Sequence, residues 1–448
     1  MILNRVERGR YLDSVALMRL SRRLAAQPGV ENAALMIGTP SNKALLRDAG
    51  LLAKEGDAAG PNDLIIAIRG ADHAARSALD AALELDDAQR PSQLPRAKTL
   101  AGALDTLPRA NLALISVPGD FAADEARKAL GAGLHTLIFS SGVSIEEERA
   151  LKALAREKGL LLMGPDCGTA FIAGTPLAFA NALPRGDIGI ISASGTGAQE
   201  VSCLIARLGS GVSHIIGVGG RDLDERVGAL ATLAAIDALE ADPATKTMVL
   251  ISKPPAPKVA DAVRERLGRA KKKHVVCFLG QDDTTLQAAA EMATGRKIET
   301  PRSGLPRVRG RVEALYCGGT LCSEAELIFR RRGLTGHRFI DLGDERYTRG
   351  RPHPMIEPEL RNEHIAAALK DPAVGVILVD VVLGYGAHAD PAAVLLQQPL
   401  NKPVIASVVG TDRDPQVRAR QVAALEQAGI HVAASNAQAA ELAANIVS

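Results

Sequence analysis

Short apolar runs alternate with stretches of helical periodicity from residue 97 to the end of the chain, and this alternation constrains the fold most strongly. The apolar runs are residues 112–117, 136–139, 160–163, 188–191, 214–218, 248–252 and 275–279, followed by 312–316, 338–341, 374–382, 403–408 and 431–433. Such alternation predicts an α/β fold in which parallel strands are joined by right-handed crossovers. Ligands then bind beyond the carboxyl ends of the strands.

Residues 1–90 show a different pattern, with strand-like runs separated by helical stretches, which predicts a small α+β domain. The segment 86–96 (DDAQRPSQLPR) has two prolines and mixed charge, as is typical of a linker. A second linker is predicted at 294–311 (TGRKIETPRSGLPRVRGR). Its six Lys or Arg residues resemble a nucleic-acid patch, but no aromatic residue is interleaved, which favours a solvated hinge.

The composition narrows the class of protein. The hydrophobic fraction is 47%, yet aromatic residues supply only 2% and Trp is absent, so the cores are expected to consist of Ala, Val, Leu and Ile. The 53 Lys and Arg nearly balance the 51 Asp and Glu, which argues against a nucleic-acid partner. Five cysteines without paired spacing indicate reduced thiols and no metal site. With no signal-like or membrane-spanning run, we expect a soluble cytoplasmic protein.

Two glycine-rich turns, each between an apolar run and a helical stretch, are the strongest local signals. They are ISASGTGAQE (191–200) and YCGGTLCSEAELI (316–328). Glycine lets the backbone approach a ligand, Ser or Thr adds a hydroxyl donor, and the first helical turn carries about half a positive charge. This combination suits a phosphate group. An ordinary strand-to-helix connection remains the alternative for either turn alone.

Several motifs together resemble a known family. Residues 112–255 resemble the alpha subunit of succinyl-CoA synthetase in SVPGDF (116–121), MGPDCGT (163–169), IGIISASGTGAQE (188–200) and IIGVGGRDL (215–223). Residues 312–448 resemble the carboxy-terminal domain of its beta subunit in GGTLCSEAELI (318–328), FIDLGDE (339–345), DPAVGVILVD (371–380) and KPVIASVVG (402–410). With an extra amino-terminal domain and no ATP-grasp domain, the chain looks like a member of the FdrA family.

The resemblance implies four domains. They are a small α+β domain (1–90), a CoA-binding-like Rossmann domain whose first strand–helix unit is missing (97–180), an alpha-ligase-like domain (186–294) and a flavodoxin-like beta carboxy-terminal domain (311–448). Companion subunits in a hetero-oligomer are also implied.

The resemblance also implies a site. In the synthetases, the helices after the two turns aim their amino ends at one phosphoryl group from opposite sides. The implied phosphate-binding residues are Ser192, Ser194, Gly195, Thr196, Gly197, Gly318, Gly319 and Thr320. The implied substrate-binding residues are Gly164, Pro165, Asp166, Gly219, Gly220 and Asp222.

Three departures from the family pattern bear on the chemistry. The synthetases carry phosphate on a histidine after the strand that corresponds to 275–279, but no histidine occurs here between Val275 and Gly336. We expect His214 to be structural. Lys253 stands where a supporting glutamate would lie, and its ammonium group either neutralises an anion or points into solvent. The CoA-holding glycine turn is missing.

Other polar residues are assigned structural roles. Asp282, Asp283, Thr284 and Thr285 are expected to cap the next helix rather than bind Mg²⁺. His353, His364, His388 and Asp390 have irregular spacing and are expected in surface loops. For Cys317 and Cys322, packing or lining of the phosphate site is favoured over reactivity.

These features favour an acyl phosphate that arrives ready-made. The FdrA resemblance implies oxamate carbamoyltransferase, which converts carbamoyl phosphate and oxamate into oxalurate and phosphate, without a further cofactor. Lys253 and Arg221 are then the predicted catalytic residues that hold the oxamate carboxylate. An acyl-CoA ligase subunit that binds CoA is the main alternative, and a non-catalytic regulatory subunit is the third.

Overall fold

The computed structural model describes residues 1–10, 12, 14–87, 97, 99–299, 305–348 and 353–447. The chain forms two compact units, one of residues 1–144 and one of residues 145–348 with 353–448. Most of the predicted linker 86–96 lies outside the described residues. Each unit is described by itself below.

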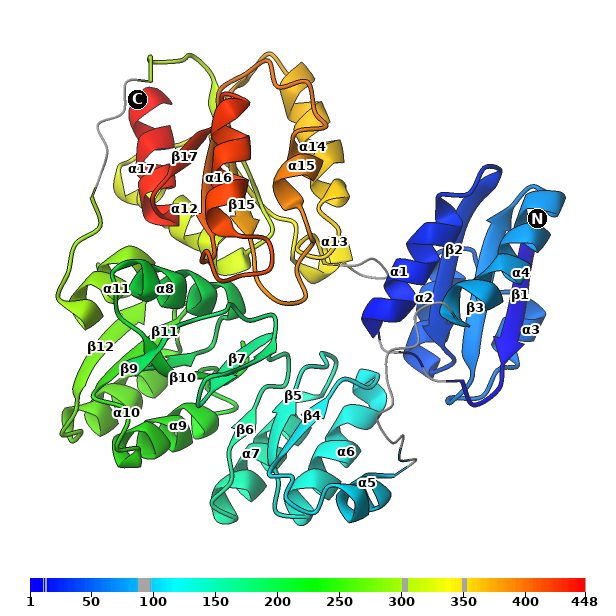
Figure 1. The fold of residues 1–448 in the computed structure, drawn as a ribbon, viewed down its shortest axis with the longest axis horizontal. Helices are drawn as coiled ribbons and strands as arrows, with labels where there is room; N and C mark the ends of the chain where they lie inside the picture. The colour runs from blue at the N-terminus through cyan, green and yellow to red at the C-terminus, as the bar shows by residue number, and fades with distance from the viewer. Residues whose placement is uncertain are drawn as a thin grey trace. The chain divides into compact units, whose positions relative to one another are not determined.

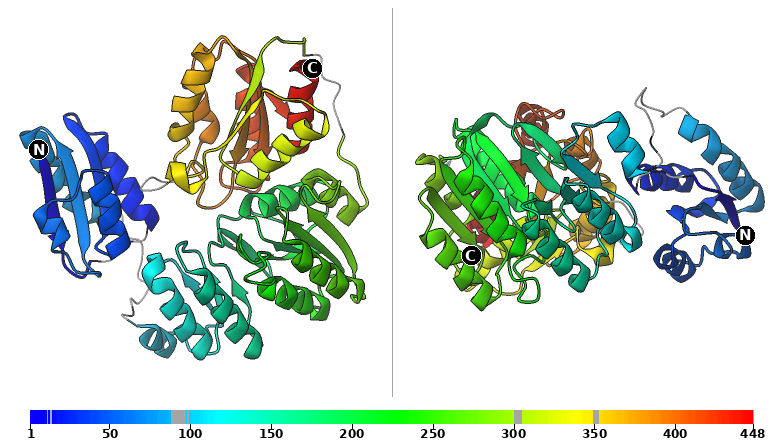
Figure 2. Two further views of the ribbon diagram at one scale, coloured as in Figure 1. Left: turned by 180° about the vertical axis from the view of Figure 1, so that it is seen from behind. Right: turned by 90° about the horizontal axis from the view of Figure 1, so that it is seen from below.

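The first unit begins with a three-stranded antiparallel sheet in the order β1-β3-β2 (Figure 2). Its elements are β1 (Ile2–Glu7), α1 (Ser14–Ala25), β2 (Val30–Ile37), α2 (Pro40–Asp48), α3 (Lys54–Asp57), β3 (Leu64–Gly70) and α4 (Asp72–Asp87). Alternate residues of β3 face opposite sides: Leu64, Ile66 and Ile68 pack with α1 and α4, whereas Ile65 and Ala67 pack with Leu46 of α2. The sheet is therefore covered on both faces.

The rest of the first unit has a strand–helix alternation. Its elements are α5 (Leu100–Thr106), β4 (Leu112–Ile115), α6 (Gly119–Gly131) and β5 (His135–Ile138). β4 and β5 pair in parallel, as the apolar runs predict.

The second unit contains a six-stranded sheet in the order β12-β11-β9-β10-β7-β8. Its elements, with the preceding helix and short strand, are α7 (Ile145–Glu157), β6 (Leu162–Met163), β7 (Thr169–Ile172), β8 (Thr175–Ala178), β9 (Arg185–Ser192), α8 (Gly195–Arg207), β10 (Val212–Gly217), α9 (Leu230–Ala241), β11 (Thr247–Ser252), α10 (Pro257–Gly268), β12 (Lys273–Phe278) and α11 (Leu286–Thr294). In Figure 1, α8 and α11 cover one face of this sheet, and α9 and α10 cover the other.

The strands β7 and β8 correct the prediction of a purely parallel sheet. They form a hairpin, and β7 also pairs antiparallel with β10. The turn consists of Ala173 and Gly174, which both have positive φ, as the two-residue hairpin turns require. The motif MGPDCGT runs into this hairpin, whose strands are too short to stand out as periodic runs.

A second sheet in this unit is fully parallel, with the order β14-β13-β15-β16-β17. Its elements are β13 (Arg311–Tyr316), α12 (Gly319–Arg331), β14 (Arg338–Asp341), α13 (Glu345–Thr348), α14 (Glu359–Lys370), β15 (Val374–Val382), α15 (Pro391–Leu395), β16 (Val404–Val409), α16 (Arg418–Gln427), β17 (His431–Ala433) and α17 (Asn436–Val447). This order is the flavodoxin-like one that the resemblance implies.

The two sheets of the second unit share one hydrophobic core. Residues of α8 and α11 from the first sheet and of α12 and α17 from the second belong to the same buried cluster. The cluster contains mainly Ala, Val, Leu and Ile, as the composition predicts. Consequently, the relation between α8 and α12 is fixed by packing within one body.

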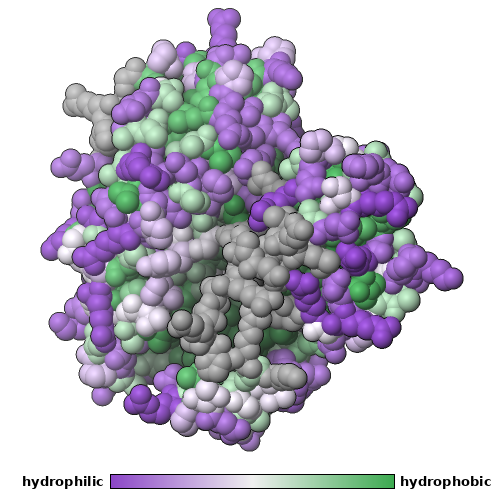
Figure 3. Space-filling view, turned by 45° about the vertical axis from the view of Figure 1, so that its right-hand side comes forward, coloured by the Kyte–Doolittle hydropathy of each residue, from purple (hydrophilic) through white to green (hydrophobic). Residues whose placement is uncertain are grey.

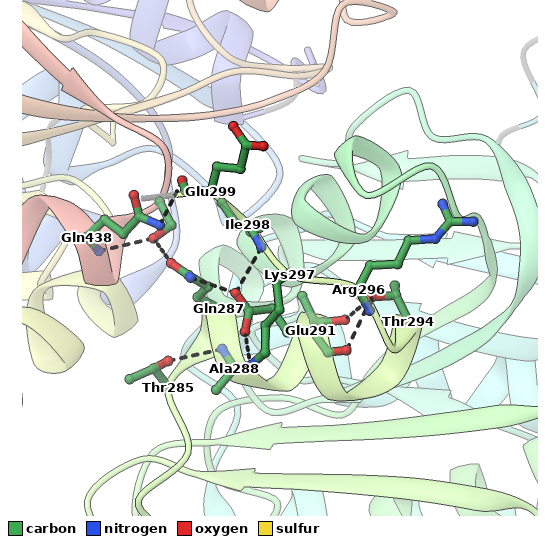
Figure 4. Close-up of polar contacts among 12 residues, drawn as sticks. Thr285, Gln287, Ala288, Glu291, Thr294, Arg296, Lys297, Ile298, Glu299 and Gln438 are labelled. Carbon is green, nitrogen blue, oxygen red and sulfur yellow. Dashed lines mark hydrogen bonds and ion pairs between the residues drawn. The ribbon is translucent and has the colours of Figure 1, made fainter. Parts of the chain in front are cut away.

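The described part of the linker 294–311 is mostly exposed, as predicted for a solvated segment, but it is also bonded to the neighbouring helices. Figure 4 shows its first residues lying against α11 and α17. Lys297 Nζ lies 2.7 Å from Glu291 Oε2, and the Ile298 amide donates to Glu291 Oε1 at 3.1 Å. Further along, the Val308 amide donates to the Ile446 carbonyl oxygen at 2.8 Å. The carboxylate of Glu291 is largely buried and needs donors, which the linker supplies.

None of the helices in the described ranges combines the length and apolar character that a bilayer crossing requires. Hydrophilic side chains predominate on the face shown in Figure 3, with hydrophobic ones scattered among them.

Candidate functional site

The first glycine turn lies between β9 and α8. Ser194 is the N-cap, and its Oγ accepts a hydrogen bond from the Gly197 amide at 2.9 Å. Ser192 Oγ accepts from the Ser194 amide at 3.1 Å and donates to the Ser194 carbonyl oxygen at 2.7 Å. The first turn of α8 contains no acidic residue. Its positive amino end is therefore not neutralised from within the helix.

The second turn, between β13 and α12, is capped differently. Gly318 is the N-cap and offers no side chain. Instead, the carboxylate of Asp380 in β15 accepts from the amides of Cys317 and Gly318 at 2.8 and 2.7 Å. The buried guanidinium of Arg361 lies 3.2 Å from the same carboxylate. The amide of Gly318, one of the predicted phosphate-binding residues, is thus already bonded to Asp380.

The two turns meet. Ser194 Oγ donates to Thr320 Oγ1 at 2.6 Å. A Cβ atom at Gly318 would lie 3.1 Å from Cβ of Thr196, so the backbones also approach closely there. The structure therefore brings the predicted phosphate-binding residues of both turns into one place.

A second carboxylate lies at the amino end of α12. Asp341 ends β14, and its Oδ2 is so close to Gly319 that a Cβ atom at this glycine would overlap with it. Asp341 Oδ1 accepts from the Gly343 amide at 2.9 Å. Burial raises the pKa of Asp341, although the nearby charge of Lys253 opposes that effect.

Lys253 follows the last residue of β11, as predicted, and is exposed. Its charge acts to lower the pKa values of both Asp341 and Cys322 against the stronger effect of burial. Asp341 lies against Gly319, the first residue of α12, so the charge of Lys253 acts on groups at the amino end of that helix.

The glycine-containing turn at 217–222 (GVGGRD) and the MGPDCGT motif lie against each other. A Cβ atom at Gly219, which has a φ of 86°, would lie 2.5 Å from the Pro165 carbonyl oxygen. A Cβ atom at Gly195 would lie 3.1 Å from Thr169 Oγ1, so this pair of loops borders the α8 turn. Of the other predicted substrate contacts, Gly164 is buried, and Asp166 and Gly220 are exposed.

Asp222 has a structural role that the sequence did not predict. It is fully buried and accepts from the Thr232 amide and hydroxyl at 2.8 and 2.6 Å, and Lys152 donates to it at 2.9 Å. These bonds stabilise the start of α9 and occupy the carboxylate that was predicted to contact substrate. Arg221 lies 2.8 Å from the buried Glu148, which already supplies the carboxylate partner that oxamate was predicted to provide.

In the loop after β12, the predicted capping role is confirmed for Thr285 but not for Asp282. Thr285 caps α11 by accepting from the Ala288 amide at 3.1 Å. Asp282 accepts from the Phe278 amide at 3.1 Å and pairs with Arg264 at 2.7 Å. Among the described residues, no group of three or more His, Cys, Asp or Glu residues is arranged to hold a metal ion.

His214 is structural, as expected: its Nδ1 accepts from the Ala173 amide at 3.2 Å, and its Nε2 lies 3.4 Å from Asp242. Cys317 and Cys322 are buried, and burial raises the pKa of both thiols, which confirms packing or lining over reactivity.

His353 was missed. It was predicted in a surface loop, yet burial lowers its pKa to about 4 and a Cβ atom at Gly343 would lie 2.6 Å from its Nε2. The ring thus lies against the turn after Asp341. No spacing rule connects His353 to that strand, so the sequence carries no signal for it.

A buried brace connects the two helices behind their amino ends. Glu200 and Glu324 are each the sixth residue of their helix, α8 and α12, and both are buried. Asn436 bonds both carboxylates, through its amide to Glu200 at 2.9 Å and through Nδ2 to Glu324 at 2.8 Å. Glu200 and Glu324 stand at the same position after their glycine turns, and this match can be read from the sequence.

Comparison with known proteins gives a relative that matches nearly the full length of the chain. The uncharacterized protein YahF of Escherichia coli K12 is 40% identical, with 98% of this chain and 97% of YahF covered. The chain belongs to the YahF family. The family is succinyl-CoA synthetase-like, since a CoA-ligase model matches residues 315–446 of this chain and a CoA binding domain model matches residues 185–279.

Other relatives of this YahF-family chain cover less. Subunit alpha 2 of an ADP-forming succinate–CoA ligase from Archaeoglobus fulgidus is 30% identical over 32% of this chain and 50% of that subunit. Subunit SauD of an ADP-forming sulfoacetate–CoA ligase from Bilophila wadsworthia is 26% identical over 47% and 71%. A solved acetyl-coenzyme A synthetase 1 of Ca. Korarchaeum cryptofilum, 19% identical, covers 79% of this chain and 87% of its own, with a TM-score of 0.32.

The amino-terminal residues 1–99 match a model described as the AllF heavy metal-associated domain. Heavy metal ions prefer thiolate and imidazole ligands. Residues 1–99 of this YahF-family chain contain no Cys and one His, His73, and therefore do not fit a heavy-metal site. The match shows a relationship in sequence, but the matched residues lack the metal ligands that the name of the domain implies.

Proposed function

We propose that the chain is the subunit of an acyl-CoA ligase-type enzyme that holds the phosphate of an acyl phosphate while the acyl group is transferred. The observation that carries this proposal is the 2.6 Å hydrogen bond between Ser194 Oγ and Thr320 Oγ1, at which the two helix amino ends meet. The match to CoA-ligase and CoA binding domain models supports the same chemistry.

The phosphate is proposed to bind at the amino end of α8. Asp380 and Asp341 already place negative charge at the amino end of α12, whereas the first turn of α8 has no acidic residue. Among the described residues, the first amide of α8 with a hydrogen-bond partner is that of Gly197, and the amides of Gly195 and Thr196 precede it. Preorganised donors of this kind stabilise a phosphate leaving group without a covalent intermediate.

This chain has no phosphoryl acceptor at the position where the synthetases carry phosphate on a histidine. The loop after β12 contains Asp282 and Thr285 in structural roles and no histidine. The proposed role is therefore transfer of the acyl group from an acyl phosphate to an acceptor, with any phosphorylation by ATP assigned to companion subunits. The relatives named as ligase subunits support such an assembly.

Coenzyme A is the acceptor that the comparisons favour. A second candidate is oxamate with carbamoyl phosphate as donor, the reaction that the resemblance to the FdrA family implies. One observation favours it: Lys253 presents an exposed positive charge beside the site, where a carboxylate-bearing acceptor would bind. Arg221 is a weaker partner because it pairs with Glu148.

The test is release of phosphate by the purified chain together with the products of its neighbouring genes. Acetyl phosphate with coenzyme A and carbamoyl phosphate with oxamate are the two substrate pairs, and turnover with one pair identifies the acceptor. Gly195→Val places a side chain at a position where Cβ is already 3.1 Å from Thr169 Oγ1, so it should abolish release. Gly268→Val, at a helix end with open space, is the control. Full activity in Gly195→Val would place the phosphate elsewhere.

A further inference from the structure

The proposed transfer includes the removal of a proton from the acceptor, and this step still needs a side chain that accepts the proton. The nucleophile of the acceptor, whether a thiol or an amide nitrogen, carries a proton that must leave as the new bond to the acyl carbon forms. A side chain that accepts this proton must lie within hydrogen-bond reach of the acceptor and keep an unoccupied basic atom.

The carboxylates at the meeting point differ in this respect. Asp380 is fully buried and its two oxygens receive the amides of Cys317 and Gly318, the Cys317 thiol and the Arg361 guanidinium. Asp341 is partly exposed. Only its Oδ1 has a hydrogen bond among those of the described residues, from the Gly343 amide, and its Oδ2 lies over Gly319 at the amino end of α12.

We propose that Asp341 is the general base of the transfer reaction and that its Oδ2 takes the proton of the acceptor. This inference rests on the proposed function. In the step, the acceptor's nitrogen or sulfur forms a bond to the acyl carbon, its proton moves to Asp341 Oδ2, and the bond between the acyl carbon and the phosphate oxygen breaks. The phosphate leaves with the electron pair.

Charge favours this assignment. Before the reaction, the Asp341 carboxylate and the phosphate at the amino end of α8 repel each other across the meeting point. As the phosphate gains negative charge, Asp341 becomes neutral, so the repulsion falls toward the transition state. Lys253 beside Asp341 offsets the repulsion in the ground state.

The charged and titratable neighbours of Asp341 come from several elements. Lys253 lies after β11, Asp380 in β15 and Asp344 in the turn after β14, and all three act on its pKa. His353 lies against Gly343 of the same turn, and Cys317 and Cys322 lie close enough for Asp341 to raise their pKa values. Burial has the largest effect and raises the pKa of Asp341, which makes it a stronger base than an exposed aspartate.

The experiment compares Asp341→Asn with wild type in the phosphate-release assay, using carbamoyl phosphate with oxamate and acetyl phosphate with coenzyme A. General base catalysis typically contributes about 10² to 10⁴-fold, so kcat should fall at least 100-fold with little change in KM for the acyl phosphate. The acid limb of the pH–rate profile should disappear. Asp341→Glu should restore part of kcat and of the limb. Asp344→Asn, in the same turn, should keep the wild-type kcat and move the limb only slightly to lower pH, because Asp344 raises the pKa of Asp341 less than burial and Asp380 do.

Phosphate binding separates the possible failures. Inorganic phosphate should raise the melting temperature of wild type, and more so that of Asp341→Asn because one negative charge is removed. If phosphate binds and Asp341→Asn retains wild-type kcat and pH profile, the base assignment alone is overturned. If phosphate does not bind wild type and neither substrate pair reacts, the proposed function is overturned and the base assignment with it.

Discussion

The amino ends of α8 and α12 follow almost the same sequence signature but have different surroundings. Ser194 caps α8 from within its own turn, and that end carries no acidic residue. The end of α12 has a glycine cap, and Asp380 and Asp341 from the two neighbouring strands lie against it. The sequence predicted that both turns hold one phosphate group from opposite sides. In the structure, the first turn of α8 has no acidic residue, whereas two carboxylates lie against the amino end of α12.

The largest change in stability should come from the amino end of α12. Asp380→Ala removes the partner of Arg361, which is 3% exposed, and leaves an uncompensated buried charge. Breaking a buried pair in this way costs about 3–5 kcal/mol, so the free energy of unfolding in urea should fall by that amount. Asp344→Ala, at an exposed ion pair, is the control. A loss below about 1 kcal/mol would mean that Asp380 does not hold the α12 end.

The buried brace of Glu200, Glu324 and Asn436, behind the amino ends of α8 and α12, should make stability depend on pH. Burial raises the pKa of Glu324 to about 7. The folded chain therefore binds this proton more tightly than the unfolded chain, so the contribution is present below pH ~4 and is lost as pH rises through ~7. Its size is at most about 3 kcal/mol.

Glu324→Gln does not titrate, so its free energy of unfolding should decline less between pH 5 and pH 8 than that of wild type. A residual decline is expected from Glu200, whose pKa burial also raises. Glu326→Gln, on the exposed side of the same helix, should keep the wild-type slope. Equal slopes in wild type and Glu324→Gln would rule out this contribution.

A smaller change in stability is expected at the amino end of α8. Ser194→Ala removes the cap of α8 and should lower the free energy of unfolding by about 1 kcal/mol, whereas Ser194→Gly, which copies the glycine cap of α12, should cost only a few tenths. Thermal unfolding measures both. If the glycine variant is as unstable as the alanine variant, the cap of α8 depends on contacts other than that to Gly197.

Local patterns predicted the strands and the two turns well because they depend on residues close in sequence. The strands 338–341, 374–382 and 431–433 have the predicted bounds, and Thr285 caps α11 as expected. The roles of Asp341, Asp380 and His353 could not be predicted in the same way. They are set by which strand ends lie beside α12 in the folded sheet, at sequence separations of about 20 to 60 residues from Gly319.

Asp222 illustrates another limit of sequence patterns. Its glycine-rich context, VGGRD, is that of a ligand-binding turn, and the backbone of Gly219 does approach Pro165 closely. The carboxylate, however, points into the protein and caps the start of α9, at Thr232. A motif therefore predicted the position of the loop correctly but not the direction of its charged side chain.

The most direct test of the account is a calorimetric titration of phosphate into two matched variants. Thr196 and Thr320 are the second residues of α8 and α12, and valine replaces either one with little change of shape. A hydrogen bond to a charged group is worth about 1.5–3 kcal/mol, so Thr196→Val should weaken phosphate binding about tenfold or more. Thr320→Val should weaken it by less than about threefold. The reverse order, with the greater loss in Thr320→Val, would contradict the claim that the phosphate binds at the amino end of α8.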